Sequence, residues 1–576
     1  MNFELVNKVD PKLKKKDNLL LWDSHFENQE KNILSILSEV ESNSDSYRNQ
    51  FYEFLFEISE RKINKQTLEK YLEIEDGLSF FWFSNLGQRD NYYAYPVIDD
   101  LLKIFAFLKI VEEKKITEVN LNLEVNPKIF NQIIEVLKAK RIKVNFLKKL
   151  EIKNKRDISF FFISTIYVFY AFALRFDLIK NRKNNSKIAL FDFLVDKKKT
   201  SYSKYFTVLP DLIKRNNLSF THSHLFYKKD FKSLFHSDFN FLFKKDHIVD
   251  REISFNIMFR VIKNYILLIN KRKKLRGKTN LFKSSFHKVD FKTLLFKDFI
   301  DSLIKKDIIK NLMYHEIIKK YIKKNSSLST AIYPLENQPW ESILVHNWKK
   351  LKNKNIYGMI HTTVRYWDLK MYYGKNYKKI ENILPTKILS NSPISTENLS
   401  LGGYEKNLLL NVEALRYLGL RKENNIVDQE NKILICGDFN KKINNQLLDL
   451  NSRLSKIREV DFLPHPTISK SISTGNVVDG KLIDLIKKYN IVITSSMSSS
   501  AVDAYENLKI VYQLTEQGAL NFTALRGFED VFVFDNIEEL ILSIKNKEYY
   551  IGLRKENYFY DDSRLDKWND FLNIFN

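Results

Sequence analysis

Short apolar runs rich in β-branched and aromatic residues alternate with longer stretches of helical periodicity along most of the chain. This alternation is typical of α/β folds, in which strands and helices follow one another. The pattern predicts strands over residues 78–83, 118–123, 142–146, 188–193, 218–221, 330–334, 356–361 and 387–391. It predicts helices over residues 97–111, 127–140, 340–351 and 411–418, and a mostly helical, very basic stretch over residues 250–325.

A polar stretch at residues 421–431 reads as a linker, and the alternation restarts after it. The later strands are expected at residues 432–436, 459–463, 491–494, 510–512 and 531–534, with a helix over residues 444–457. This second series has the size and order of a small doubly wound domain. We therefore predict two Rossmann-like α/β domains that face a cleft. They span residues 1–425, with helical insertions at about 150–185 and 245–325, and residues 426–576.

Composition narrows the kinds of partner. The 576 residues exceed what one compact core usually holds, and Lys plus Arg outnumber Asp plus Glu by 94 to 70, a net charge of +24. Such an excess suits an anionic partner. No zinc-finger spacing or RNP-type motif accompanies it, so we expect no nucleic acid. The single cysteine, Cys436, excludes an internal disulfide, and the N-terminus has no signal-peptide pattern, which favours the cytoplasm.

Residues 158–174 form a run of seventeen uncharged residues flanked by Lys and Arg. A membrane-spanning helix needs about 20 apolar residues, with a lower limit near 17. A buried core helix and a helix that dips into the membrane both fit this length. Strand-like segments of one expected domain lie on both sides of the run, so surface attachment to the inner face of the inner membrane, aided by the basic excess, is favoured over a true span.

Two motifs of the C-terminal domain follow predicted strands. Pro464, His465 and Pro466 form the first, and a serine-rich turn over residues 494–500 forms the second. Ligands of open α/β sheets bind beyond the carboxyl ends of the strands. A protonated histidine there can offset charge on a leaving phosphate, and hydroxyl and backbone N–H groups can bind an anion. Asp503 and Glu506, in the helix after the turn, are positioned to accept hydrogen bonds from ribose hydroxyls.

The His-Pro motif followed by paired serines resembles bacterial sialyltransferases and the related Kdo- and nonulosonate-transferring enzymes. The runs ENQPWE, GMIHTTV, KILSNSP, NVEALRYL, KILICGDF, LPHP and TSSMSSSAVDAYENL are similar to a family of surface-carbohydrate biosynthesis proteins from lipopolysaccharide and capsule loci, over about residues 328–540. The resemblance implies a GT-B-like fold, a CMP-activated sugar donor and no metal or other cofactor. The donor-binding residues that it implies are His465, Pro466, Ser495, Ser496, Ser498 and Ser499.

Acids in the first 425 residues supply candidates for a general base. Sialyltransferases carry an acidic pair before Gly, a composition that Glu75, Asp76 and Gly77 share, although a turn ahead of a strand is the alternative. Glu336 is better placed, because it follows a predicted strand in a loop constrained by two prolines, with a helix-capping role as its alternative. On the acceptor side we expect Gln338 and His361, with a core histidine as the alternative for His361. On the donor side we expect Gly437 and Asp438, with a tight turn as the alternative.

The sequence therefore predicts an enzyme that transfers a nonulosonic acid or Kdo from a CMP donor to a lipid-linked or surface glycan. Two other hypotheses stay open. One is a nucleotide-sugar epimerase or polyol-phosphate transferase of the same architecture. The other is a non-enzymatic basic protein that binds lipid or nucleic acid.

Overall fold

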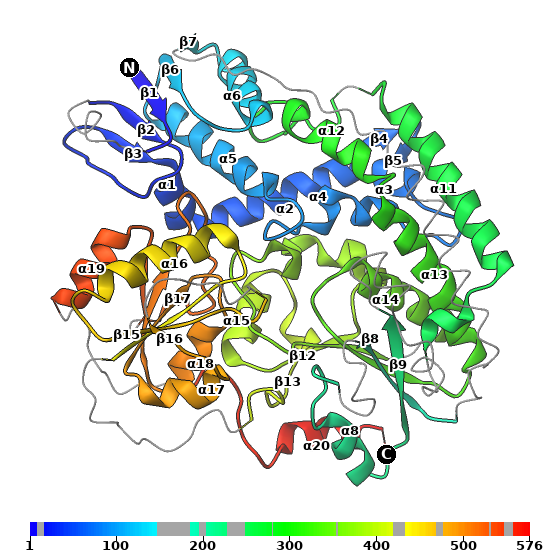
Figure 1. Ribbon diagram of the computed structural model, residues 1–576. Helices are drawn as coiled ribbons and strands as arrows, with labels where there is room; N and C mark the ends of the chain where they lie inside the picture. The colour runs from blue at the N-terminus through cyan, green and yellow to red at the C-terminus, as the bar shows by residue number, and fades with distance from the viewer. Residues whose placement is uncertain are drawn as a thin grey trace.

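Three parallel sheets, covered by helices, make up the part of the chain that the computed structural model describes (Figure 1). That part comprises residues 1–8, 17–146, 185–194, 203–226, 248–278, 280–352, 355–418, 432–467, 476–528, 531–546 and 557–575. Helices connect the strands and cover the sheets, so the expectation of an α/β fold with Rossmann-like parallel sheets is confirmed.

The first sheet belongs to the N-terminal region. Its strand order is β3 (Ile33–Ser35), β2 (Leu19–Leu21), β1 (Asn2–Val6), β6 (Glu118–Asn122) and β7 (Lys143–Phe146). The helical elements around it are α1 (Ile36–Ser42), α2 (Ser44–Glu60), α3 (Leu68–Tyr71), η2 (Phe80–Phe83), α4 (Asn85–Gln88), α5 (Val97–Glu113) and α6 (Pro127–Ala139). A small hairpin joins β4 (Lys62–Ile63) to β5 (Gln66–Thr67). The sequence analysis missed the three strands that come first in the chain, and β1 lies at the centre of this sheet.

The middle sheet has the strand order β13 (Leu409–Asn411), β12 (Lys387–Ser390), β11 (Ile356–Met359), β10 (Thr330–Pro334), β8 (Ile188–Leu194) and β9 (Phe220–Phe226). Its helical elements are α8 (Leu209–Arg215), η3 (Val249–Glu252), α11 (Phe255–Leu275), α12 (Lys292–Ser302), α13 (Lys306–Lys324), α14 (Pro339–Lys352), η4 (Leu369–Met371), η5 (Gly374–Ile383), α15 (Pro393–Leu401) and η6 (Lys406–Leu408). The helical character expected for residues 250–325 is confirmed by η3, α11, α12 and α13.

The C-terminal sheet has the order β16 (Asn476–Val477), β15 (Val460–Leu463), β14 (Ile433–Cys436), β17 (Ile491–Ser495), β18 (Ile510–Leu514) and β19 (Val531–Phe534). Its helical elements are α16 (Lys441–Leu454), α17 (Leu482–Leu485), η7 (Ile486–Lys488), α18 (Ser500–Glu506) and α19 (Ile537–Lys545). Separate apolar clusters cover its two faces. The five strands expected here are all present, with small differences in their ends.

The last helix, α20 (Asp566–Asn573), returns to the middle sheet (Figure 1). Its Trp568 and Phe571 belong to the apolar cluster of Ile332 and Tyr357 in that sheet. The chain therefore crosses back to the middle sheet after the C-terminal sheet is complete. The division into residues 1–425 and 426–576 stays a prediction.

The strand predicted for residues 78–83 is wrong, because Phe80–Phe83 form the 3₁₀ helix η2. All four aromatic side chains are buried, and the Ser79 hydroxyl accepts a hydrogen bond from the N–H of Phe81 at the start of the turn. A short run that is apolar on every side satisfies a buried strand and a buried helical turn equally well.

The helix predicted for residues 411–418 is also wrong. Asn411 ends β13, and the backbone N–H groups that follow it bind distant carbonyls: Val412 donates to Ser390 over 2.8 Å and Ala414 to Tyr560 over 2.7 Å. These partners lie in β12 and in the returning C-terminal segment. Tertiary hydrogen bonds therefore replace the helical ones that the apolar spacing suggested.

Residues 158–174 lie outside the described residues, so their membrane interpretation stays a prediction. Among the described residues, the helices are all too short or too polar to cross a bilayer.

Candidate functional site

A carboxylate and an imidazole meet at the carboxyl edge of the middle sheet. Glu336 follows β10 and His361 follows the neighbouring β11, and Glu336 Oε1 lies 3.3 Å from His361 Nε2. The Gln338 amide donates a hydrogen bond to the other oxygen of Glu336. The His361 side chain is buried, whereas a third of the Glu336 side chain is exposed. The structure thus brings together the three residues that the sequence analysis placed on the base and acceptor side.

The loop that carries Glu336 is held by a second acid. One oxygen of Glu341 accepts the backbone N–H groups of Glu336 and Asn337, over 3.0 and 2.9 Å. Burial, followed by the charge of Glu336, raises the pKa of Glu341 well above its usual range. The capping alternative considered for these acids therefore describes Glu341, whereas the Glu336 carboxylate contacts His361 and Gln338.

The surroundings of Glu336 favour its ionised form. Burial opposes the charge, but the hydrogen bond and charge of His361 and the charge of Lys370 lower the pKa of Glu336 below its usual value. Burial also opposes the charge of Lys370, yet Asp368 and neighbouring acids raise the pKa of that ammonium. Glu336 is therefore a carboxylate at neutral pH, which is the form that a general base requires.

Four residues that the sequence analysis did not select lie beside this pair. Asp192 of β8 contacts His224 of β9, with 2.5 Å between Oδ1 and Nδ1, and both are buried. The Tyr205 ring stands edge-on to the His361 ring at 4.9 Å, and burial, followed by the charge of Glu336, raises the pKa of Tyr205 to about 12. Asp192 could have been noticed as a charge within an apolar strand. Tyr205, His224 and Arg416, which lines the same small cavity as Tyr205, carried no such signal.

The space behind His361 is closed. Tyr205, Asn391 and Arg416 line it with His361, and its volume of about 10 Å³ leaves room for about one water molecule. This space is therefore too small for any ligand larger than water.

The C-terminal sheet presents a different edge. Asp438 follows β14 and accepts a hydrogen bond from the hydroxyl of Ser495 at the end of β17. Its other oxygen accepts the backbone N–H of Asn440 over 2.8 Å, so the carboxylate holds a tight turn. A Cβ at Gly437 would lie 3.2 Å from the backbone nitrogen of His465, so glycine lets the loops after β14 and β15 approach each other. The turn alternative for Gly437 and Asp438 fits these contacts.

His465 lies beside that turn, half-buried, and the following Pro466 is exposed. Its Nδ1 is 2.8 Å from the Thr467 hydroxyl and accepts the backbone N–H of Thr467 over 3.3 Å. The ring stands against Phe439, with 5.8 Å between the ring centroids. With Nδ1 used as an acceptor, the opposite nitrogen of the ring is left to donate to a ligand.

The serine turn joins the same edge. The Ser496 hydroxyl is buried and has no hydrogen-bond partner within the described part of the chain. The Ser498 hydroxyl accepts the N–H of Ser500 over 3.2 Å, and Ser499 immediately precedes α18. His465 and the turn flank Asp438 from neighbouring strands of one sheet, as the sequence predicted.

The two acids of α18 have different surroundings. Burial raises the pKa of Asp503 to about 6, although the charge of Arg416 opposes the shift. The Glu506 carboxylate is buried and accepts the backbone N–H of Tyr558. Glu506 thus fastens the returning C-terminal segment, whereas Asp503 lies at the side that Arg416 of the middle unit approaches.

The two edges meet through Arg365. Its guanidinium donates to the backbone carbonyl of Met497, in the serine turn, over 2.8 Å. Arg365 belongs to the loop that continues from His361. The carboxyl edge of the middle sheet therefore faces the carboxyl edge of the C-terminal sheet. This is the GT-B-like arrangement of two Rossmann-like units that the sequence predicted.

Asp76 lies elsewhere. Its carboxylate is 3.1 Å from His315 Nε2, and Lys319 also binds it. The His315 hydrogen bond, opposed by burial and reinforced by Lys319, holds the pKa of Asp76 well below its usual range. Asp76, His315 and Glu316 place ligand atoms within 4.8 Å of one another, but the Lys319 ammonium already binds Asp76. The turn alternative fits Asp76, because Gly77 has φ +76°.

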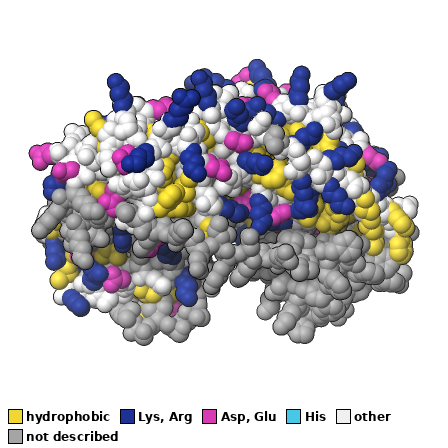
Figure 2. All heavy atoms as spheres, turned by 90° about the horizontal axis from the view of Figure 1, so that it is seen from above, with side chains coloured by type: hydrophobic (Ala, Val, Ile, Leu, Met, Phe, Trp, Pro, Cys, Tyr) yellow, Lys and Arg dark blue, Asp and Glu magenta, His cyan; other side chains and the backbone are white. Residues whose placement is uncertain are grey.

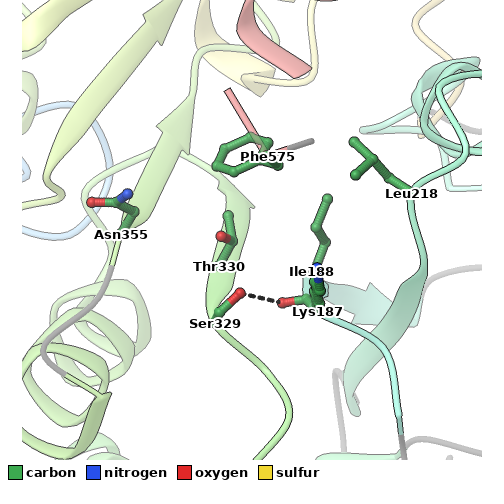
Figure 3. Close-up of a pocket in the computed structure, with 7 residues that line it drawn as sticks. All are labelled: Lys187, Ile188, Leu218, Ser329, Thr330, Asn355 and Phe575. Atoms are coloured by element: carbon green, nitrogen blue, oxygen red, sulfur yellow. Dashed lines mark hydrogen bonds between the residues drawn. The ribbon is translucent and has the colours of Figure 1, made fainter. Parts of the chain in front are cut away.

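A hollow of about 460 Å³ opens at the opposite, amino ends of the middle strands (Figure 3). Ile188 and Thr330 line it where β8 and β10 begin, and the Ser329 hydroxyl donates to the carbonyl of Lys187 over 3.3 Å. Ligands of parallel sheets bind at the other ends of the strands. We therefore place the candidate site at the edge that carries Glu336 and not here.

No protein-family model matches the sequence, and no curated protein matches it. One similar solved structure is UDP-GlcNAc 2-epimerase from Neisseria meningitidis bound to UDP-GlcNAc, at 11% identity and a TM-score of 0.36, covering 68% of this chain and 100% of that chain. Acinetobacter baumannii MurG follows at 9% and 0.34, covering 63% and 92%. Anabaena HepE in complex with UDP and glucose follows at 9% and 0.33, covering 63% and 89%. Similarity at this level assigns no activity to this chain.

Proposed function

We propose that the protein is a glycosyltransferase that moves a sugar from a nucleotide-activated donor to a hydroxyl of a cell-surface glycan. One observation supports this most. The carboxyl edges of the middle and C-terminal sheets, which carry different groups, face each other where Arg365 contacts Met497. One edge holds an ionised carboxylate, and the other holds an imidazole and a group of hydroxyls. Acceptor activation and donor binding need these two sets of groups.

Glu336 is the general base in this proposal. Its carboxylate takes the proton of the acceptor hydroxyl while the hydroxyl oxygen forms a bond to the anomeric carbon of the donor sugar. The bond between that carbon and the phosphate oxygen breaks, and the nucleotide leaves with the electron pair. His361 holds the Glu336 carboxylate in place and keeps it ionised. This step needs no redox partner.

The donor phosphate lies between His465 and the serine turn in this proposal. The ring N–H of His465 opposite Nδ1 donates a hydrogen bond to the phosphate oxygen on which the departing nucleotide gains negative charge. The Ser496 hydroxyl, buried without a partner among the described residues, is the strongest candidate for a hydrogen bond to the phosphate. Ser495 and Asp438 shape the turn, and Asp503 accepts a hydrogen bond from a ribose hydroxyl.

The resemblance of the His-Pro and serine motifs to those of CMP-sugar enzymes supports a more specific proposal for the donor. We propose CMP as the nucleotide and a nonulosonic acid or Kdo as the sugar, with a lipid-linked or surface glycan at the inner membrane as acceptor. The proposal includes no metal, and the ring N–H of His465 and the serine hydroxyls supply the hydrogen bonds to the phosphate.

The test begins with binding. Purified protein is titrated with CMP, UDP and CDP by calorimetry, and then mixed with CMP-sialic acid or CMP-Kdo and a panel of glycan acceptors, with product masses measured. We expect binding of CMP and release of CMP on transfer. Ser496→Ala should weaken CMP binding by about tenfold, the cost of one lost hydrogen bond to a charged group. Ser455→Ala, in the turn after α16, is the matched control.

Two outcomes would redirect the assignment. Tight UDP binding with epimerisation of the donor, or binding of CDP-alditols, would establish the epimerase or polyol-phosphate hypothesis instead. Absence of binding of any of the three nucleotides at millimolar concentration would overturn the proposal.

A further inference from the structure

The long helix α11 has apolar side chains on two opposite faces. Ile257, Val261 and Leu268 belong to the core cluster. On the other face, Phe259, Ile262 and Ile266 are 72, 43 and 51% exposed. Their spacing of three and four residues puts them in one row along the helix, opposite the buried row. A surface helix normally presents polar residues there.

The same helix is strongly cationic. Residues 255–275 contain no Asp or Glu and six Lys or Arg, and the positive residues concentrate at its C-terminal end. Lys273, Lys274 and Arg276 are exposed there. Figure 2 shows Lys and Arg side chains standing among hydrophobic side chains over the upper face of the molecule, toward which α11 rises in Figure 1. An apolar row bordered by positive charge is the composition of helices that lie in a membrane interface.

We propose that the outer face of α11 docks onto an anionic lipid bilayer. Phe259, Ile262 and Ile266 enter the boundary between headgroups and acyl chains, and Lys273 and Lys274 bind lipid phosphates. The charge of α11 favours an anionic bilayer as its partner, because a helix without a carboxylate and with several exposed cations complements an anionic surface. The inference stands on α11 alone and does not depend on the proposed glycosyltransferase activity.

The test uses the full chain and sedimented vesicles. Vesicles of phosphatidylglycerol and phosphatidylcholine in equal parts are compared with vesicles of phosphatidylcholine alone. We expect binding to the first and little to the second. The triple substitution Phe259→Ser, Ile262→Ser and Ile266→Ser, and separately Lys273→Glu with Lys274→Glu, should each weaken partitioning to the anionic vesicles by about tenfold or more.

The matched control removes three exposed apolar residues elsewhere. Leu401→Ser, Ile457→Ser and Leu542→Ser change the end of α15, the turn after α16 and the outer side of α19, and should leave partitioning unchanged. Circular dichroism melting and nucleotide titration of every variant separate lost membrane binding from lost folding or lost activity. If the α11 variants fold and bind vesicles like the parent, or if the triple substitution instead converts a dimer to a monomer, the proposal is overturned.

Discussion

The carboxyl edges of the middle and C-terminal sheets are built from opposite chemistry. At the middle sheet, Glu336 is fixed by His361, Gln338 and the charge of Lys370. At the C-terminal sheet, His465 and the serine turn present imidazole and hydroxyl groups, and the one acid between them, Asp438, is occupied by Ser495 and Asn440. The first edge is suited to move a proton and the second to receive a phosphate.

The difference extends to how each edge is stabilised. The middle edge depends on ionic neighbours that set the pKa of one carboxylate, so a single substitution should change its chemistry without changing its shape. The C-terminal edge depends on close backbone approach at Gly437 and on hydrogen bonds within its turns. Substitutions there should lower nucleotide affinity, whether or not they also lower turnover.

The largest expected effect, on turnover, is that of replacing Glu336 at the edge of the middle sheet. Glu336→Gln keeps the volume and one acceptor but removes the base, so we expect turnover to fall by about 10²- to 10⁴-fold, with nucleotide affinity changed by less than about threefold. Steady-state kinetics with calorimetric nucleotide binding measures both. Glu381→Gln, an exposed acid of the same unit, should change neither. A Glu336→Gln enzyme with normal turnover would show that the middle edge does not supply the base.

The next effect is expected at His465. His465→Ala removes the ring N–H proposed to bind the phosphate of the leaving nucleotide, so turnover should fall by about 10²- to 10³-fold and nucleotide affinity should fall as well. This dual loss distinguishes the C-terminal edge from the middle one. His25→Ala changes another half-buried histidine, in the N-terminal region, and serves as control. Equal nucleotide affinity in both variants would contradict the donor role of His465.

The C-terminal sheet was the part of the fold best predicted from sequence. Three of its strands, β14, β15 and β17, are short apolar runs followed at once by Gly437, Pro464 and Ser496, and these signals mark both the strand and its end. In the first sheet, β6 and β7 were predicted, but β1, β2 and β3 were missed. β2 and β3 have three residues each, too few for a period to be detected, and the apolar run at residues 80–83 has no period at all.

Some residues of the candidate site could likewise be predicted from the sequence, and others could not. His465, Ser495 and Glu336 follow strands directly, so the rule that ligands bind at carboxyl ends was enough to select them. Tyr205 approaches His361 from a segment more than 150 residues earlier in the chain, and Asp192 meets His224 only because β8 and β9 pair. Asp76 was selected by composition alone, and its partners on α13 are brought to it by tertiary packing.

A smaller effect on turnover is expected when His361, which contacts Glu336, is replaced. In His361→Gln the electrostatic contribution and hydrogen bond of the imidazole are lost, burial then dominates, and the pKa of Glu336 rises. In the parent the base stays ionised until the pH falls through its lowered pKa. The acid limb of the profile of kcat/KM against pH should therefore move to higher pH, with turnover at pH 8 reduced by about tenfold or less. An unmoved acid limb would show that His361 does not set the ionisation of Glu336.

The smallest effect is expected at Asp503, where burial raises the pKa from 3.8 to about 6. Between these values the folded protein keeps a proton that the unfolded chain has released. The free energy of unfolding contributed by Asp503 therefore falls as the pH rises from about 4 to 6, and the full penalty remains above pH 6. Asp503→Asn removes this penalty. Relative to the parent, it should gain roughly 1–2 kcal/mol between pH 4 and pH 7.5 in urea unfolding, a value reduced from the full shift because the side chain is partly exposed.

If the carboxylate also binds a ribose hydroxyl, the more stable variant should bind nucleotide more weakly, by about three- to tenfold. If the variant gains stability and keeps full nucleotide affinity, Asp503 does not bind the donor. The C-terminal edge would then differ still more from the edge that carries Glu336.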